Sequence, residues 1–181
     1  MSNHYYRNLS LAGLNIADLS VADLRALVKE ILAAKIHGIS FSPYVEGQGP
    51  GTELGADQIR QRLQIIQPYI NWVRTFSCTE GHEQIPAISA ENGLQTMVGV
   101  WLDDDREHNE LELNNAIEVA KAGHADILAV GNEVLLRGEL SEDELIDYIN
   151  RAKQAAPGVP VGYVDAYFEF VDHPRVTEAC D

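Results

Sequence analysis

Cysteine is scarce in this sequence, with only two residues, Cys78 and Cys180, among 181. Their separation along the chain fits neither a metal-binding motif nor a redox motif, so we expect no metal site. Two free thiols are typical of a protein in a reducing compartment. We therefore expect a cytoplasmic protein that is not held together by disulfide bonds.

Basic residues are also few, since 13 Lys and Arg stand against 28 Asp and Glu, giving a formal net charge of −15 at pH 7. A chain this acidic repels phosphate backbones and anionic lipid surfaces. We therefore expect neither a nucleic-acid partner nor a membrane partner. A neutral ligand such as a sugar is compatible with this charge.

Long apolar runs and phosphate-binding loops are missing as well. No apolar run approaches the roughly 20 residues that a membrane-spanning helix needs. The first residues, 1–7, lack the apolar core of a signal peptide. No Gly-x-Gly-x-x-Gly or Walker loop follows a strand-like segment, so a nucleotide-binding sheet has little support. We expect no cofactor.

What the sequence does contain is a regular alternation of strand-like and helix-like segments. In the segment 20–34, Leu24, Leu27 and Ile31 share one helical face. Ser20 can cap the start of this helix. Further helices are predicted over 56–70, 83–91, 107–122 and 141–157, and strands over 36–41, 72–78, 95–102, 125–133 and 159–165.

The order of these segments predicts an α/β protein with a parallel sheet. The strands are short and apolar with little alternation, which is typical of strands covered on both faces by helices. The same rhythm occurs in the TIM (β/α)8 barrel, which needs about 250 residues, so this chain supplies roughly five of the eight βα units. We expect residues 1–34 to form an N-terminal extension with one helix, and residues 35–181 to form an incomplete barrel.

The candidate site lies at the carboxyl ends of the strands, where barrel enzymes place their functional residues. Asn132 and Glu133 end the apolar strand 125–133, which sets a carboxyl group and an amide side by side at the mouth of the barrel. Aromatic rings beside a carboxyl group suit a carbohydrate, because a pyranose has an apolar face and a hydroxyl-rich edge. The other strand ends carry Tyr44, Phe76, Trp101, Asp165 and Tyr167, with Arg74 slightly deeper.

Four of these strand ends resemble a known family. The segments 38–44, 73–77, 97–102 and 129–135 (the last reading Ala-Val-Gly-Asn-Glu-Val-Leu) look like glycoside hydrolase family 17, the β-1,3-glucanase family of retaining barrel glycosidases. The resemblance covers residues 35–181 and is greatest to the bacterial members.

The resemblance implies a role for each site residue. Glu133 matches the acid/base that protonates the glycosidic oxygen, and Asn132 matches the amide that binds the 2-hydroxyl of the sugar. That role requires Glu133 to stay protonated, through partial burial or a second carboxylate about 5–5.5 Å away. Arg74 is expected to support the rim carboxylates electrostatically. Substrate contacts are expected from Tyr44, Phe76, Trp101, Asp165 and Tyr167.

The nucleophile of the family is a glutamate at the tip of the seventh strand, and this chain has no counterpart. Asp165 is the nearest substitute, but it lies one strand away from Glu133 and not across the barrel. We therefore expect a truncated chain that is inactive in isolation. Five strands also leave two unpaired edges, so we expect marginal stability, self-association, or a second polypeptide that completes the barrel.

Other interpretations stay open at this point. Hydrolysis of β-1,3-glucan is the default activity, with transglycosylation as a close variant, and a non-catalytic glucan-binding or interaction module is the alternative. Glu133 could instead cap the following helix, and the aromatic residues could simply fill the core. The acidic run 103–107 is read as a helix cap and not as a cation site. An aldolase or isomerase barrel is disfavoured, because no lysine lies at a strand tip.

Overall fold

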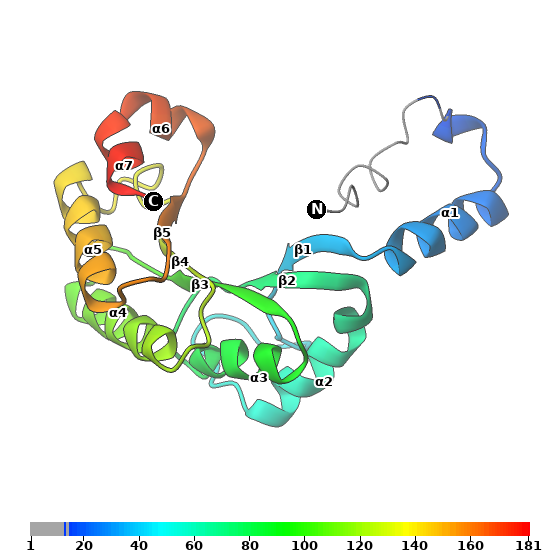
Figure 1. Ribbon diagram of the computed structural model, residues 1–181, viewed down its shortest axis with the longest axis horizontal. Helices are drawn as coiled ribbons and strands as arrows, with labels where there is room; N and C mark the ends of the chain where they lie inside the picture. Colours follow the sequence, from blue (N-terminus) through cyan, green and yellow to red (C-terminus); the bar gives the residue numbers. More distant parts are fainter. Residues whose placement is uncertain (1–12, 14) are drawn as a thin grey trace.

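The computed structural model describes residue 13 and residues 15–181, and it contains a sheet of five parallel strands. The strands follow one another in the order β1-β2-β3-β4-β5, so each new strand pairs with the one before it (Figure 1). This sequential parallel order is that of a barrel wall. The strands are β1 Ile36–Ser40, β2 Ile70–Arg74, β3 Gln95–Val100, β4 Ile127–Asn132 and β5 Val161–Val164.

A helical segment follows each strand, as the periodicity predicts. Helix α2 ends at Ile66 and continues as a short 3-10 turn, because Pro68 cannot donate the backbone hydrogen bond that the helix needs. The helices are α1 Val21–Ala33, α2 Ala56–Ile66, α3 Ile85–Glu91, α4 Arg106–Lys121, α5 Glu142–Ala155, α6 Tyr167–Asp172 and α7 Pro174–Ala179, with 3-10 turns η2 Ile16–Asp18, η3 Gln67–Tyr69 and η4 His82–Gln84.

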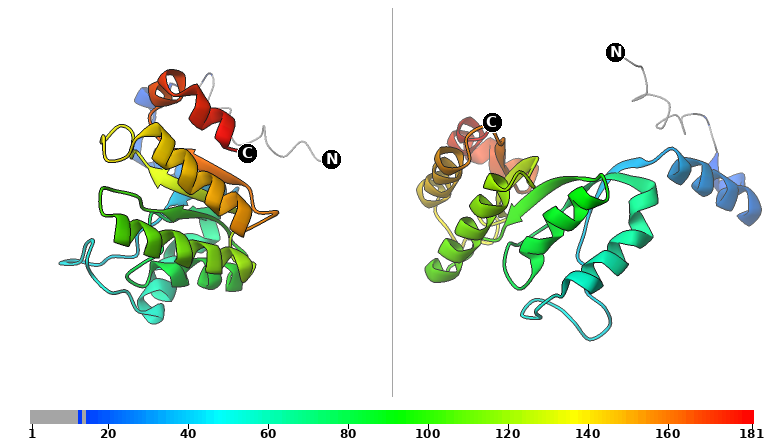
Figure 2. Two further views of the ribbon diagram at one scale, coloured as in Figure 1. Left: turned by 90° about the vertical axis from the view of Figure 1, so that its left-hand side faces the viewer. Right: turned by 60° about the horizontal axis from the view of Figure 1, so that its bottom comes forward.

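The helices cover one face of the sheet and not both. Helices α2 to α5 lie along the outer, convex face, and within the described residues no helix packs on the concave face (Figures 1 and 2). The expectation of helices on both faces is therefore wrong. A barrel has helices outside and side chains inside, so this one-sided cover fits the incomplete barrel and excludes a doubly wound sheet.

The core lies between the strands and the outer helices. One cluster of buried residues joins β1 and β2 to α2 and α3, and a larger cluster joins β3, β4 and β5 to α4, α5 and α7. Full burial of a Leu or Ile side chain stabilises the fold by about 1.5–3 kcal/mol. Fully buried representatives are Ile59, Leu63, Val73 and Ile85 in the first cluster, and Val98, Leu113, Leu128, Leu145 and Ile149 in the second.

Several helix starts follow the caps expected from the sequence. The Ser141 hydroxyl accepts from the backbone N–H of Glu144, and the Glu144 carboxylate accepts from the backbone N–H of Ser141, which is a complete capping box. The Asp105 carboxylate caps α4, and the Ser20 hydroxyl caps α1. Within the segment 103–107, Asp105 is thus confirmed as the helix cap.

Helix α1 stands apart from the sheet. None of its residues is buried among the described part of the chain, and it meets the rest of the fold near η3 (Figure 1).

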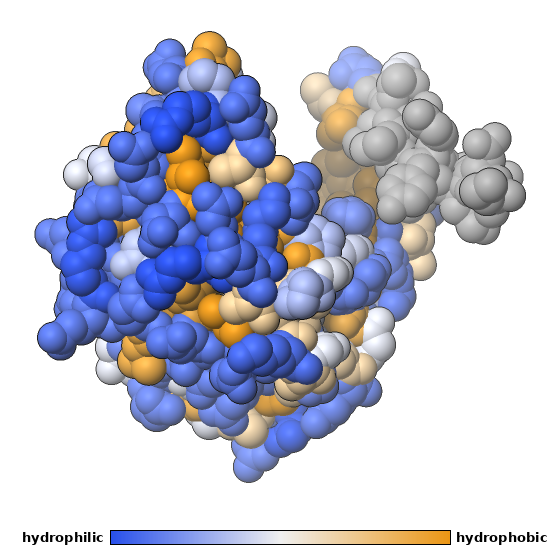
Figure 3. Space-filling view, turned by 60° about the vertical axis from the view of Figure 1, so that its left-hand side comes forward, coloured by the Kyte–Doolittle hydropathy of each residue, from blue (hydrophilic) through white to orange (hydrophobic). Residues whose placement is uncertain are grey.

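The outer surface of α4 and α5, on the other side of the molecule, is mostly hydrophilic (Figure 3). The proposed boundary between 34 and 35 stays a prediction. No helix in the described residues is both long and apolar enough to cross a membrane.

Candidate active site

The tip of β4 has an irregular backbone that directs Asn132 and Glu133. The pairing of β4 with β5 shifts register between Ala129 and Asn132, which marks a bulge. Gly131 provides it with a φ of 91°, and a Cβ atom there would lie 2.9 Å from Cε2 of Tyr163. Only glycine fits this position without strain, so the bulge before Asn132 and Glu133 depends on Gly131.

Glu133 itself has a left-handed backbone, with a φ of 53°. A non-glycine residue in this region costs about 1–3 kcal/mol, and such strain clusters at functional sites. Its N–H donates to the carbonyl of Val164 at 2.8 Å, and its carbonyl accepts from Arg137 at 2.9 Å. The side chain is exposed, so the partial burial expected from the sequence is not found in the described residues. Ser141, and not Glu133, caps α5.

Arg74 on β2 holds the amide of Asn132. Its Nη2 donates to Oδ1 of Asn132, so the amide offers its NH2 group to a ligand hydroxyl. The guanidinium lies 4.8 Å from the ring centroid of Phe76, and its buried Nε has no hydrogen-bond partner in the described structure. Burial lowers the pKa of Arg74, and attraction to Glu133 partly offsets this. Arg74 thus anchors Asn132, whereas its electrostatic support of the rim carboxylates stays a prediction.

Arg137, which the sequence interpretation missed, joins the tips of β3 and β4. Its Nη1 donates to the carbonyl of Asn132, and its Nη2 donates to the carbonyl of Leu102 at 2.7 Å. Its guanidinium also stacks 4.4 Å from the centroid of a Trp101 ring. Arg137 therefore fixes the position of Trp101 relative to Asn132.

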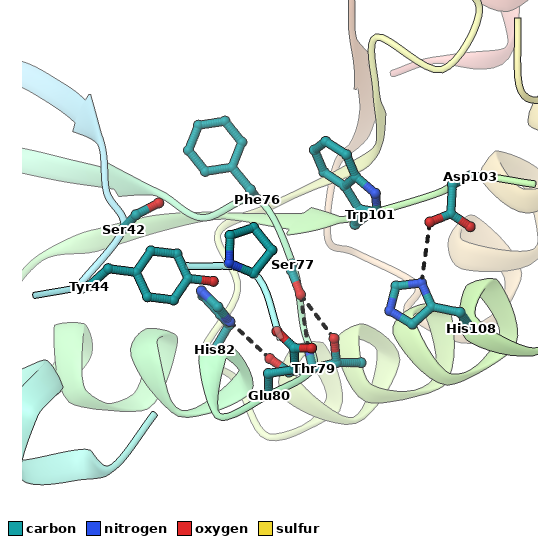
Figure 4. A pocket seen from close by; sticks show the side chains of 11 residues that line it. Ser42, Tyr44, Phe76, Ser77, Thr79, Glu80, His82, Trp101, Asp103 and His108 are labelled. Atoms are coloured by element: carbon teal, nitrogen blue, oxygen red, sulfur yellow. Dashed lines mark hydrogen bonds and ion pairs between the residues drawn. The ribbon is translucent and has the colours of Figure 1, made fainter. Parts of the chain in front are cut away.

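Three predicted sugar-contacting rings line one cavity at the tips of β1, β2 and β3. Figure 4 shows Tyr44, Phe76 and Trp101 arranged around it. Its volume is about 380 Å³, which lies within the usual range of about 300–1,000 Å³ for ligand pockets. The remaining lining residues are Ser42, Pro50, Ser77, Thr79, Glu80, His82, Asp103 and His108.

The wall of this cavity near β1 is held by polar contacts. His82 packs edge-on against the Tyr44 ring at 5.4 Å, and its Nδ1 donates to the carbonyl of Thr79 at 2.9 Å. The Glu80 carboxylate accepts from the backbone of Gly51 at 2.8 Å, which fastens the loop after β1. Burial, and then the charge of Glu80, raises the pKa of Tyr44, so its hydroxyl remains a hydrogen-bond donor.

The remaining predicted contacts lie outside the cavity. The Asp165 carboxylate accepts from the Tyr163 hydroxyl, from the backbone of Ala166 at 2.7 Å and from the backbone of Leu136 at 3.4 Å. Burial, and then this hydrogen bond, raises the pKa of Tyr163 well above its usual value. Tyr167 on α6 is 81% exposed. Substrate contacts by Asp165 and Tyr167 stay predictions.

Helix α4 contributes polar side chains that the sequence interpretation also missed. The fully buried Glu112 accepts four hydrogen bonds from the tips of β2 and β3. The buried Asn109 pairs with both backbone groups of Asp103, at 2.9 and 2.8 Å. Their spacing on the inward face of α4, beside Leu113, was the available signal. No group of three or more potential metal ligands occurs among the described residues.

Comparison with known proteins gives a consistent picture. The model of the BtgE/BtgC glycoside hydrolase domain matches residues 38–181. A glucan 1,3-beta-glucosidase of Candida albicans is 31% identical over 127 residues, which cover 61% of this chain and 41% of that protein. A glucan 1,3-beta-glucosidase of Schizosaccharomyces pombe is 29% identical over 129 residues, covering 65% of this chain and 40% of that protein.

Among solved structures, the family 17 beta-1,3-glucanosyltransferase of Rhizomucor miehei matches with a TM-score of 0.67 and 26% identity, covering 82% of this chain and 56% of that one. An active-site mutant of the same enzyme, solved in complex with laminaritriose, matches equally well. The chain thus spans about two fifths of the length of these curated relatives and just over half of the solved chain.

Proposed function

Because the chain belongs to the BtgE/BtgC glycoside hydrolase family, we propose that its rim is the acid/base half of a retaining site that acts on β-1,3-glucan. The observation that carries this proposal is the tip of β4, where a bulge and a left-handed backbone present Glu133 beside an anchored Asn132. The family 17 resemblance and the barrel-type fold are confirmed by the family match and the structural neighbour.

In this proposal each side chain has one task. Glu133 protonates the glycosidic oxygen and later takes a proton from the incoming hydroxyl, which belongs to water in hydrolysis or to a sugar in transglycosylation. Asn132 donates from its NH2 group to a hydroxyl of the bound sugar. Tyr44, Phe76 and Trp101 pack against the apolar faces of neighbouring glucosyl units. The laminaritriose bound by the related enzyme supports this choice of ligand.

The retaining mechanism also requires a nucleophilic carboxylate about 5–5.5 Å from the acid. Asp165 is engaged by Tyr163 and Ala166, so it is a poor candidate. We propose that the nucleophile comes from a segment that supplies the sixth to eighth βα units and lies outside these 181 residues. The outer sides of β1 and β5, where the described residues add no further strand, and the partial match to the relatives support this.

The two open edges lead to a test of the isolated chain. Neither β1 nor β5 has a further neighbouring strand among the described residues, so their outer backbone groups can pair with another strand. The exception is Val161 on β5, whose N–H and C=O already bond to Asp181, at 2.9 Å each. We therefore expect the purified 181-residue chain to associate, or to unfold with low cooperativity, when it is studied without a partner. Sedimentation velocity combined with urea unfolding measures both properties. A monomer that unfolds in one cooperative transition would contradict the proposal that further βα units are needed to complete the barrel.

A non-catalytic glucan-binding module is a second candidate. It is favoured by the cavity, because loops after β1, β2 and β3 form that cavity without any contribution from Glu133. The two candidates differ in turnover and not in binding. In both, Trp101 binds sugar and glutamine at position 133 leaves the binding affinity unchanged, but only the enzyme loses turnover with it.

Substitution of Trp101 by alanine is expected to weaken binding of laminarihexaose by at least about tenfold, because truncating a tryptophan anchor typically costs about 2 kcal/mol or more. Isothermal titration calorimetry on the isolated chain measures this loss. The other tryptophan, Trp72, stacks on His37 away from the cavity, so Trp72→Phe is the matched control. Equal affinity for wild type and Trp101→Ala would remove the cavity from the proposed glucan site.

A further inference from the structure

Glu112 is a fully buried carboxyl group whose acceptor positions are filled by two strand tips. Its Oε1 accepts from the hydroxyls of Ser77, at 2.5 Å, and Thr79, at 2.6 Å. Its Oε2 accepts from the backbone N–H groups of Cys78, at 2.8 Å, and Trp101, at 2.9 Å. Two oxygens offer about four acceptor sites, so this carboxyl group is satisfied by the protein alone.

An apolar residue would be the simpler choice at position 112. Its neighbour Leu113 and the next turn at Ala116 are buried in the core, and the inward face of α4 is otherwise mostly apolar. Burying a carboxyl group is unfavourable unless its hydrogen bonds are complete. Packing alone therefore does not explain a carboxyl group at this position. The four hydrogen bonds that it accepts, from Ser77, Cys78, Thr79 and Trp101, indicate its role.

Those groups belong to the two aromatic walls of the cavity. Ser77 directly follows Phe76 in the chain, and Trp101 is bonded through its own backbone N–H. Figure 4 shows Ser77 and Thr79 beneath the two rings, on the side of α4. A single carboxyl group thus links the residues that follow β2 to the end of β3, beyond the last direct bonds between the two strands, which Thr75 makes to Met97 and Gly99.

His108, one turn before Glu112 on α4, completes the arrangement on the cavity side. Its Nε2 lies 3.8 Å from Oε1 of Glu112, and its Nδ1 lies 3.7 Å from Oδ2 of Asp103. His108 lines the cavity, whereas Glu112 lies behind it without any exposed surface. Glu112 therefore cannot touch a ligand and acts through the residues that it holds.

We propose that Glu112 is a positioning residue, a buried acceptor that fixes the Phe76 and Trp101 rings at the spacing a glucan chain requires. The ligand part of this inference rests on the proposed function, whereas the positioning part does not. The proposal assigns the role to the acceptor oxygens and not to the charge. Glutamine can then replace it, because its carbonyl can accept from both backbone N–H groups while its NH2 donates to hydroxyls that rotate to accept.

The test uses fluorescence from Trp101 in a Trp72→Phe background, where it is the remaining tryptophan of two. Glu112→Met keeps the length of the side chain but leaves the two backbone N–H groups unsatisfied. We expect a red-shifted emission and stronger acrylamide quenching in Glu112→Met, and wild-type behaviour in Glu112→Gln. The matched control is Glu118→Met on the same helix, whose side chain is 72% exposed.

Glu112→Asp serves as a second variant in case Glu112→Met does not fold. It keeps the carboxyl group but withdraws it by one C–C bond, about 1.5 Å, so it cannot reach both strand tips. The same red shift is expected. Unchanged Trp101 emission in a folded Glu112→Asp or Glu112→Met protein would overturn the proposal, and so would a red shift in Glu112→Gln equal to that of Glu112→Met.

Binding of laminarihexaose provides the second measurement. We expect Glu112→Asp to bind about tenfold more weakly, equal to about 1.4 kcal/mol, and Glu112→Gln to bind like wild type. If Trp101 responds as expected but wild type binds no glucan, the proposed function fails while the positioning role stands. If wild type binds and Glu112→Asp binds equally well with a displaced Trp101, the link between ring position and glucan binding is overturned.

Discussion

Glutamine at position 133 is expected to lower turnover of β-1,3-glucan by about 10²–10⁴-fold, the usual contribution of a general acid or base. An amide can hydrogen-bond to the glycosidic oxygen but cannot transfer a proton to it. The effect requires a complete site. We would complete it by co-expressing this chain with the part of the Rhizomucor miehei enzyme that the structural match does not cover. Release of reducing ends from laminarin measures the turnover.

A second substrate separates acid catalysis from general damage to the site. An aryl β-glucoside with a dinitrophenolate leaving group needs no proton to depart, so its glycosylation step is expected to lose far less in Glu133→Gln. The exposed Glu46, in the loop after β1, gives the matched control Glu46→Gln. Equal losses on both substrates would mean that position 133 does not act as the acid.

The isolated chain gives a further check on the assignment of the nucleophile. Without the segment that carries the second carboxylate, we expect negligible turnover of laminarin by the 181 residues alone. If the isolated chain hydrolysed laminarin and Glu133→Gln abolished this, the nucleophile would have to be one of its own carboxylates. Asp165 would then be the first candidate, despite its hydrogen bonds to Tyr163 and Ala166.

The order of strands and helices could be predicted because local patterns determine it. Residues 56–66 repeat apolar side chains at helical spacing, and Ile59 and Leu63 are indeed buried on one face of α2. Ser141 and Glu144 form a capping box within four residues, so no distant contact is needed to recognise it. These features depend on neighbours in the chain, which a sequence displays directly.

The supporting contacts of the site could not be predicted in the same way. Glu112 meets Ser77 across 35 positions, and Arg137 meets Leu102 across another 35. Arg137 lies in a turn just before the acidic segment 139–144, whose composition is typical of a solvated loop. The left-handed backbone of Glu133 also left no local sign, apart from Gly131 two positions earlier. These contacts and this backbone conformation arise only when the folded sheet brings the ends of different strands together.

Alanine at position 131 is expected to destabilise the fold by about 2–5 kcal/mol. An L residue in the left-handed region costs about 1–2 kcal/mol, and overpacking a filled core costs about 1–3 kcal/mol more. The added Cβ would lie 2.9 Å from Cε2 of Tyr163 and 3.2 Å from Cδ1 of Leu145, two residues of the larger core cluster. Urea unfolding followed by circular dichroism measures the loss.

Gly162 on the neighbouring strand β5 provides the matched control. A Cβ atom added there meets no atom within 4 Å, and its φ lies outside the left-handed region, so Gly162→Ala is expected to change stability by no more than about 1 kcal/mol. Similar unfolding midpoints for the two variants would show that the bulge tolerates a side chain. Because the bulge directs Asn132 and Glu133, any folded Gly131→Ala protein is also expected to lose turnover in the completed barrel, whereas Gly162→Ala keeps it. The geometry of the acid therefore depends on a residue that carries no side chain.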